Sequence, residues 1–258
     1  MILKITRIIR EISNGATKPY IVECDDGKQY VAKFPGNPDG TRVLINELVC
    51  ALLAKKLKLP LPDFKVVEID NIETFDVLEE DIKLINGSVF CSKYVEKATQ
   101  IPSYRFVQKV NNIDDALKIL IFDVIVGNND RNKGNLLVNL KNNSLVMIDH
   151  SHVFIGEAIW DERLLRELVG NNISIDEMNH FFLDMFINEV NKFDKKEFYE
   201  YINLVRSITL KDINKIIEKI PEDWLITKEE KDALSSFIYD RVKRVDEICE
   251  LFGIERRD

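Results

Sequence analysis

The stretch "GNNDRNKGNLLVNLKNNSLVMIDH", residues 127–150, decides the fold class of this chain. Its two apolar runs, around "LLV" and "LVM", predict a pair of short strands joined by a turn at "KNNS". The loops beside these strands carry polar side chains of the kind that bind cations or phosphates: Asn128, Asp130, Arg131, Asn135 and Asp149. A hairpin brings its two ends together, so Asn135 and Asp149 are expected to lie close in space. The stretch therefore predicts a polar site at the end of a buried hairpin.

The order of these side chains matches the chemistry of phosphoryl transfer. Asp130 and Asn135 are separated by four residues, and Asp149 follows the second strand. Amide and carboxylate oxygens suit Mg²⁺, which usually takes one or two such protein ligands together with phosphates and water. Asp130, ahead of the hairpin, would face the attacking hydroxyl, as in the D-x-x-x-x-N and later Asp of kinase sites. We therefore predict Asp130 as the catalytic aspartate and Asn135 and Asp149 as metal ligands.

A plainer interpretation of the same stretch is that it contains only turns. Asn and Asp are common turn formers, and "KNNS" is well explained in this way. Turn formation does not explain the ordered series of Asp, four residues, Asn, strand, turn, strand and Asp. A metal and nucleotide site is therefore the interpretation that we prefer.

A lysine upstream supports this interpretation. The segment "YIVECDDGKQYVAKF", residues 20–34, predicts two strands around a turn at Asp26 and Gly27, with Lys33 in the second strand. A helix predicted over residues 41–59 carries Glu47 near its start. Kinases hold a strand lysine on the nucleotide phosphates by pairing it with a helix glutamate. Lys33 and Glu47 are therefore predicted to bind the nucleotide together.

The remaining pattern predicts an α+β fold of two lobes. The N-terminal part reads as strands with one helix, and further strands are expected at "FKVVEI", residues 64–69, and "SVFCSKYV", residues 88–95. A buried helix over residues 112–127 precedes the hairpin, and helices follow to the end, where Ser174 with Glu177 and Thr227 with Glu230 match capping boxes. We expect an N-lobe over residues 1–96 and a C-lobe over 97–258, with the boundary in "EKATQIPSY", residues 96–104.

Composition excludes several classes of protein. The 258 residues, 45% hydrophobic and 31% charged, are typical of a globular chain. A net charge of −8 and a pI of about 5.2 argue against general nucleic-acid binding, because an acidic surface repels phosphate backbones. The longest apolar run, "LKILIFDVIVG", is interrupted by Asp123 and is too short to span a membrane. With no N-terminal signal pattern, and four scattered cysteines expected to be reduced, we expect a cytoplasmic protein.

The chain resembles the HipA-like kinases. The resemblance is carried by "YVAKFPGNPDGTRVLINELVCALLAKKLKLPLP", "GNNDRNKGNLLV" and "MIDHSHVF", in matching order over roughly residues 10 to 160. It implies a protein-kinase-like fold, related to that of phosphatidylinositol kinases, with Asp130 as the catalytic aspartate. It also implies that Asn135 and Asp149 hold Mg²⁺ and that Lys33 contacts the phosphates of ATP. Some members are toxins that pair with an antitoxin, so an antitoxin-type partner is also implied.

The chain departs from the family pattern in two places. Ser151 follows "DH" where family members often have Gly. The segment "SNGATKPY", residues 13–20, takes the place of a glycine-rich phosphate loop and is either a phosphate cradle or an ordinary hairpin loop. Its candidate phosphate contacts are Ser13, Gly15, Thr17 and Lys18.

Three other positions are candidates for roles in the site. Residues 90–93 end a strand just before the lobe boundary, so the backbone at Cys91 and Lys93 is expected to bind adenine, unless these side chains are core. Arg131 is expected to pair with a phosphate, with Asp149 or in a structural ion pair. His150 is expected to pack like the aromatic residue of a kinase D-F-G turn.

The sequence thus predicts an ATP- and Mg²⁺-dependent kinase that phosphorylates a protein Ser or Thr. A small-molecule or lipid kinase, or an adenylyl transferase, could use the same fold, although the acidic charge counts against lipids. A nucleotide-binding pseudokinase is the alternative from another class. It is disfavoured because a protein without catalytic activity has no chemical need for all five of the residues that the chain retains: Lys33, Glu47, Asp130, Asn135 and Asp149.

Overall fold

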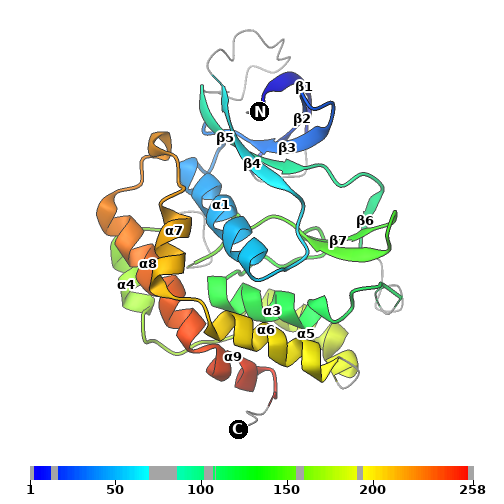
Figure 1. Ribbon diagram of the computed structural model, residues 1–258, viewed down its shortest axis with the longest axis vertical. Coiled ribbons are helices and arrows are strands. Elements are labelled where there is room, and N and C mark those ends of the chain that lie inside the picture. Colours follow the sequence, from blue (N-terminus) through cyan, green and yellow to red (C-terminus); the bar gives the residue numbers. More distant parts are fainter. Residues whose placement is uncertain are drawn as a thin grey trace.

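The computed structural model of the chain describes residues 3–12, 17–69, 86–101, 107, 109–154, 160–190 and 194–254, without the side chains of 178, 181, 183 and 187–190. An antiparallel sheet forms the N-terminal part, and helices form most of the remainder, with α1 between them (Figure 1). The predicted α+β, two-lobed layout is therefore confirmed.

The N-terminal sheet has five antiparallel strands in the order β1-β2-β3-β5-β4. The strands are β1 Ile5–Glu11, β2 Tyr20–Cys24, β3 Gln29–Lys33, β4 Phe64–Ile69 and β5 Gly87–Lys93. The hairpin between β2 and β3 turns at the predicted place, where Gly27 takes a φ of 72°, a conformation that glycine adopts without strain. Lys33 ends β3 opposite Phe90 of β5, so the sheet places the lysine on its central strand.

The C-terminal part surrounds a second, three-stranded sheet and one buried helix. Its elements are β6 Ala98–Gln100, α3 Asp115–Val126, β7 Leu136–Asn139, β8 Ser144–Met147, α4 Glu162–Leu168, α5 Glu177–Val190, α6 Lys195–Arg206, α7 Leu210–Ile217, η2 Glu222–Trp224, α8 Lys228–Lys243 and α9 Val245–Leu251. Nearly every residue of α3 is buried, which explains its continuous apolar sequence. None of the described helices combines the length and hydropathy of a membrane span.

The structure corrects two details of the predicted layout. The segment expected only to join the lobes contains β6, which pairs with β7 and so extends the predicted hairpin to three strands. Helix α5 begins at Glu177, so the predicted capping box of Ser174 with Glu177 is wrong. The capping box of Thr227 with Glu230 is confirmed at the start of α8, where both of its hydrogen bonds form.

Helix α1, Thr41–Lys56, is buried on most of its faces. Leu44, Leu48 and Ala51 are buried, as the predicted helical pattern requires. Asn46 and Glu47 are buried as well, because β5 packs on one side of α1 while α7 and η2 pack on another. Buried polar side chains require partners, so these two residues must be held by specific contacts.

The C-terminal part returns to the N-terminal sheet at η2. The carboxylate of Asp223 accepts a hydrogen bond of 2.6 Å from the backbone N–H of Ser88 in β5. The indole Nε1 of Trp224 donates to the carbonyl of Ser88 at 2.8 Å. Thr41, the first residue of α1, donates to the carbonyl of Trp224 at 3.0 Å. The sheet and α1 are therefore tied to the same short C-terminal segment.

Gly127 marks the point where the chain leaves α3 and enters the polar stretch. It caps α3 in a left-handed conformation, with φ 60°. A Cβ at this position would lie 2.7 Å from the carbonyl oxygen of Phe154. The chain that follows the hairpin therefore passes too close to the end of α3 for any side chain at residue 127.

We expect Gly127→Ala to lower the free energy of unfolding more than Gly170→Ala does. Both glycines have positive φ, at 60° and 76°, so each alanine carries a left-handed cost of about 1–2 kcal/mol. Only Gly127 also lacks space for a Cβ, because nothing lies within 4 Å of the Cβ position at Gly170. Overpacking should add about 1–3 kcal/mol at Gly127. Urea unfolding of both variants measures the difference, and equal losses would contradict the close approach.

Candidate active site

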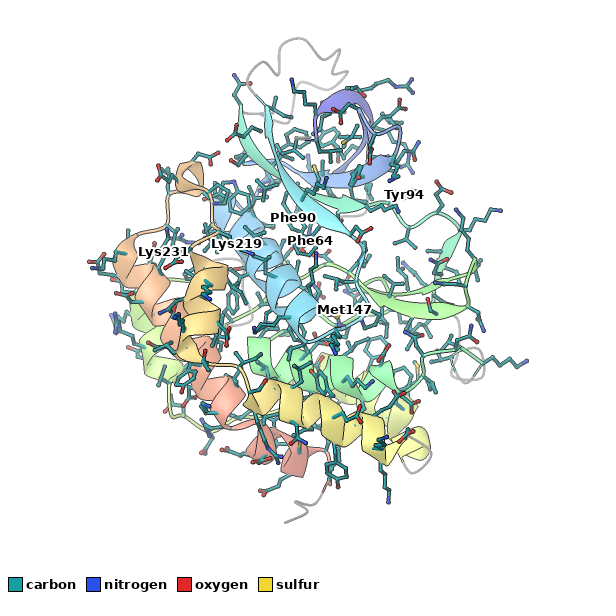
Figure 2. All side chains as sticks on the ribbon, in the orientation of Figure 1. Phe64, Phe90, Tyr94, Met147, Lys219 and Lys231 are labelled. Atoms are coloured by element: carbon teal, nitrogen blue, oxygen red, sulfur yellow. The ribbon has the colours of Figure 1, made fainter. Side chains whose placement is uncertain are left out.

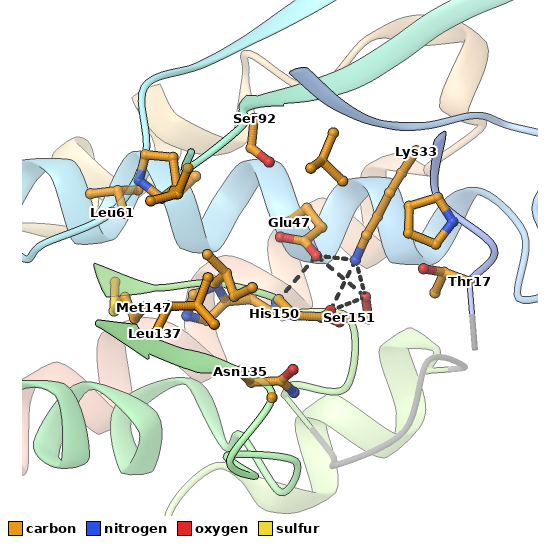
Figure 3. A pocket seen from close by; sticks show the side chains of 18 of the residues that line it. Thr17, Lys33, Glu47, Leu61, Ser92, Asn135, Leu137, Met147, His150 and Ser151 are labelled. Atoms are coloured by element: carbon orange, nitrogen blue, oxygen red, sulfur yellow. Dashed lines mark hydrogen bonds and ion pairs between the residues drawn. The ribbon is translucent and has the colours of Figure 1, made fainter. Parts of the chain in front are cut away.

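A cavity of about 920 Å³ lies between the N-terminal sheet with α1 and the β7–β8 hairpin. Its apolar wall consists of Val31, Ala51, Leu61, Phe64, Phe90, Leu137, Met147 and Ile148. Phe64, Phe90 and Met147 are labelled in Figure 2, between the sheet and the hairpin. Figure 3 shows the charged side chains, with Lys33 and Glu47 among them, on the side away from Leu61 and Met147. The cavity thus joins an apolar compartment, suited to a flat ring, to a charged one.

Lys33 is the centre of the charged compartment. Its Nζ donates to Glu47 Oε1 at 2.5 Å, to Asp149 Oδ1 at 2.9 Å and to Ser151 Oγ at 2.7 Å (Figure 3). An ammonium group has three protons, so all of its donors are used. The structure therefore brings together Lys33, Glu47 and Asp149 from three separate segments of the sequence.

The charges of this cluster stabilise one another. Burial alone would lower the pKa of Lys33, but the carboxylates of Asp149 and Glu47 raise it above its ordinary value. Burial would raise the pKa of Asp149, but Lys33 and the hydrogen bond from Ser151 hold it well below its usual range. Burial dominates at Glu47 and raises its pKa. Lys33 is consequently a cation and Asp149 an anion at neutral pH.

The carboxylate of Asp130 is held by two amides at the edge of the cavity. Asn132 Nδ2 donates to its Oδ1 at 2.8 Å, and Asn135 Nδ2 donates to its Oδ2 at 3.0 Å. The backbone N–H of Asp130 donates to Asn128 Oδ1 at 2.9 Å. The side chain of Asp130 remains 39% exposed, so it is fixed in direction but open to an incoming group.

Arg131 faces the interior, which corrects its predicted role in cofactor binding. Its guanidinium is fully buried and forms two hydrogen bonds with Asp123 of α3, at 2.8 and 2.9 Å. Its Nη1 donates to the carbonyls of Asn135, just before β7, and Ile148, just after β8. Of the three alternatives predicted for Arg131, the structural ion pair is therefore the one that forms, with Asp123 as its partner. Asp123, the residue that interrupts the apolar run, anchors the polar stretch.

The two histidines near the site differ in environment. His150 is buried and packs edge-on against Phe122, with ring centroids 5.8 Å apart. Burial and the adjacent Arg131 hold the pKa of His150 well below its ordinary value. Arg131 Nη2 lies 3.0 Å from His150 Nε2, and because arginine only donates, Nε2 is the acceptor. His152 instead lines the cavity, with Nδ1 3.9 Å from Asp130 Oδ2, although the sequence analysis assigned it no role in the site.

The predicted phosphate loop is described only in part. Thr17 is buried and lines the cavity near Lys33 (Figure 3). Lys18, with φ 43°, does not line the cavity. Ser13 and Gly15 lie outside the described residues. Of the described residues of this loop, Thr17 and Pro19 line the cavity, and Thr17 has the polar side chain.

Of the two residues expected to bind adenine, Lys93 lines the cavity and Cys91 does not. Cys91 is fully buried in the core of the sheet and does not line the cavity, so its predicted contact with a nucleotide is corrected. Lys93 lines the cavity, but its backbone N–H and that of Tyr94 donate to Asp63 and Gln29. Val95 lines the cavity next, and within the described chain its backbone makes no hydrogen bond. Tyr94 and Val95 are the residues that sequence reasoning missed here.

Comparisons with known proteins agree on a family and a fold. The family model described as "HipA-like kinase" matches residues 5–250. The crystal structure of CtkA, a proinflammatory kinase of Helicobacter pylori, superposes with a TM-score of 0.57 at 13% identity, covering 96% of both chains. HipA from the toxin–antitoxin system of Shewanella oneidensis MR-1, solved with HipB and operator DNA, gives a TM-score of 0.54 at 13% identity, covering 97% of this chain and 68% of that one.

At such identities the two structures show a shared fold alone. None of the curated proteins matches the chain significantly. The family match, in contrast, spans nearly the whole sequence and includes both halves of the cavity. The chain belongs to the HipA-like kinase family.

Proposed function

We propose that this protein uses ATP and Mg²⁺ to phosphorylate the hydroxyl of a Ser or Thr in a protein. Membership of a kinase family supports the reaction type. The observation that carries the proposal is the convergence of Lys33, Asp130, Asn135 and Asp149 on one cavity that also has an apolar wall. Cation, carboxylates and apolar wall match the charged and aromatic parts of a nucleotide.

The side chains proposed to hold the metal fit a hard divalent cation. Asp149 forms its hydrogen bonds through Oδ1, and within the described chain its Oδ2 has no partner. The side-chain Nδ2 of Asn135 donates to Asp130, which leaves the side-chain oxygen Oδ1 of Asn135 for a ligand. In the described chain, no three His, Cys, Asp or Glu residues cluster as a metal site of their own. That agrees with Mg²⁺, which takes few protein ligands and completes its shell with phosphates and water.

The residues of the chain would share the work by position and charge. Bound Mg²⁺ would supply charge neutralisation at the phosphates. Lys33, fixed by Glu47, would donate to the phosphates, and the backbone of Val95, which forms no hydrogen bond with the described residues, would bind the base. Asp130, held by two amides, would direct the acceptor hydroxyl toward the phosphate. Positioning of this kind accounts for a large part of the rate enhancement in phosphoryl transfer.

A protein hydroxyl is supported as the acceptor by the openness of the site at Asp130. A side chain that is 39% exposed can be reached by a Ser or Thr on a flexible segment of another protein. An antitoxin-type partner is proposed from the family resemblance alone. A cytoplasmic location is supported by the four free, buried cysteines, which suit a reducing compartment.

We place the lobe boundary between residues 96 and 97, which gives an N-lobe of residues 1–96 and a C-lobe of 97–258. The pairing of β6 with β7 supports this division, because it assigns residues from Ala98 onward to the second sheet. The segment from Lys93 to Val95 would then be the hinge that lines the cavity.

Asp130→Asn is expected to abolish phosphoryl transfer while leaving nucleotide binding intact. Loss of the aspartate that orients the hydroxyl should reduce turnover by about 10²- to 10⁴-fold. The measurement is the intact mass of the protein, with ADP release, after incubation with ATP, Mg²⁺ and candidate protein acceptors. Equal turnover in the variant and the unmutated protein would contradict the role of Asp130.

The same experiment separates the alternative functions. A phosphate-sized gain in mass on a protein supports the proposal, whereas an AMP-sized gain would replace it by adenylyl transfer. Phosphorylation of a small molecule or lipid alone would change the acceptor class. Nucleotide binding with no transfer to any acceptor would indicate a pseudokinase.

Lys33→Met is expected to weaken ATP binding by about 10- to 100-fold, because a hydrogen bond to a charged group contributes about 1.5–3 kcal/mol. Affinity for adenosine should be unchanged, since adenosine has no phosphates. Fluorescence titration with both ligands measures this, and thermal unfolding checks that the variant is folded. An equal loss of affinity for both ligands would show that Lys33 supports the cavity without contacting phosphates.

A further inference from the structure

Ser151 is buried inside the charged cluster and contacts Lys33, Glu47 and Asp149. Its side chain is 2% exposed. Its Oγ lies 2.7 Å from Lys33 Nζ, 2.6 Å from Asp149 Oδ1 and 3.3 Å from Glu47 Oε1 (Figure 3). A hydroxyl at the centre of such a cluster must satisfy several charged groups at once.

The direction of each hydrogen bond follows from the donors that are present. Lys33 can only donate, so the hydroxyl of Ser151 accepts from it. The hydroxyl then has one proton to give, and Asp149 Oδ1 at 2.6 Å is a much closer acceptor than Glu47 Oε1 at 3.3 Å. Ser151 therefore donates to Oδ1 of Asp149.

Two strong donors on Oδ1 fix the direction of the Asp149 carboxylate. Both Lys33 Nζ and Ser151 Oγ bind Oδ1, and within the described chain Oδ2 has no hydrogen-bond partner. The side chain of Asp149 is 35% exposed and lines the cavity. Its backbone has φ 57°, a left-handed conformation that is uncommon for residues other than glycine but is adopted more readily by Asn, Asp and His. Oδ2 is thereby left as the oxygen that can take a ligand.

Ser151 is itself held in place by a chain of buried hydrogen bonds. Its carbonyl accepts from Asn46 Nδ2 at 2.6 Å. Asn46 Oδ1 in turn accepts from the indole Nε1 of Trp160 at 2.7 Å. Asn46 precedes Glu47 on α1, so the same helix positions both Glu47, which binds Lys33, and Ser151. The hydroxyl is thus fixed in relation to Lys33.

The three donors of Lys33 are already occupied, so contact with a phosphate requires that one of them be given up. Resting on the proposed function, we propose that Ser151 is a positioning residue for the metal ligand. Its hydroxyl keeps Oδ1 of Asp149 occupied when Lys33 turns to the phosphates, so Oδ2 continues to face the cation. Hydrogen-bond partners of metal-binding carboxylates commonly set metal affinity in this way.

The test measures binding of Mn²⁺, as a probe of the divalent site, in the presence of a non-hydrolysable ATP analogue. Electron paramagnetic resonance counts free Mn²⁺ for the unmutated protein, Ser151→Ala, Ser151→Thr and Asp149→Asn. Ser236→Ala is the matched control, because among the described residues the exposed hydroxyl of Ser236 hydrogen-bonds only to the carbonyl of Asp232 within α8. Adenosine affinity of each variant is measured in parallel.

Ser151→Ala is expected to weaken Mn²⁺ binding by about 10- to 100-fold, the usual effect of removing such a partner, while adenosine binds as before. Ser151→Thr, which retains the hydroxyl, should recover much of the affinity, and Asp149→Asn should lose it. Unchanged Mn²⁺ affinity in Ser151→Ala would overturn the inference, as would a proportional loss of adenosine affinity, which would make Ser151 merely structural. If the unmutated protein bound no Mn²⁺ with the nucleotide, the proposed function would fail as well.

Discussion

A buried charge in a protein interior requires a partner of opposite charge. Arg131 and Asp123 form such a pair, and this ion pair positions the residues around the β7–β8 hairpin. Neither side chain has exposed surface. Asp123 is fixed in α3, a helix in which nearly every residue is buried. From there Arg131 binds the carbonyls of Asn135 and Ile148 and the ring of His150. One ion pair thus holds the loop, both ends of the hairpin and the turn that carries Asp149.

The second constraint is the fixed position of α1, which lies on the opposite side of the cavity from the β7–β8 hairpin. Arg42 pairs with Glu230 of α8, and Lys56 with Asp212 of α7. Together with the contact of Thr41 to Trp224, these tie both ends of α1 to C-terminal elements. Glu47 therefore holds Lys33 from a helix that is fixed by the opposite lobe. Lys33 stays in register with Asn135 and Asp149 because α1, which carries its partner Glu47, and the β7–β8 hairpin are both anchored in the C-terminal part.

These two constraints explain why the cavity is already organised for a charged ligand. Lys33 and Asp149 stabilise each other's charged form, so a cation donor and a free carboxylate oxygen face the same space. Asp130 is aimed by two amides and not by an ion pair, which leaves its carboxylate available to a hydroxyl. Folding has therefore already fixed the directions of these side chains before any ligand binds.

The sequence by itself located most of the helices and strands and the polar residues that meet at the hairpin. Alternating and helical periods located the strands and α1, and the spacing of Asp130, Asn135 and Asp149 across a hairpin required those residues to converge. Such signals are local, because they depend on neighbours along the chain. Only the tertiary structure decided which polar groups face inward: Arg131 turned to Asp123, Cys91 entered the sheet core, and Val95 and His152 reached the cavity. The three-residue strand β6 exists because β7 offers it a partner, and Ser151 gained its contacts because α1 brings Lys33 and Glu47 to it. Each of these depends on a partner distant in sequence, which no local pattern encodes.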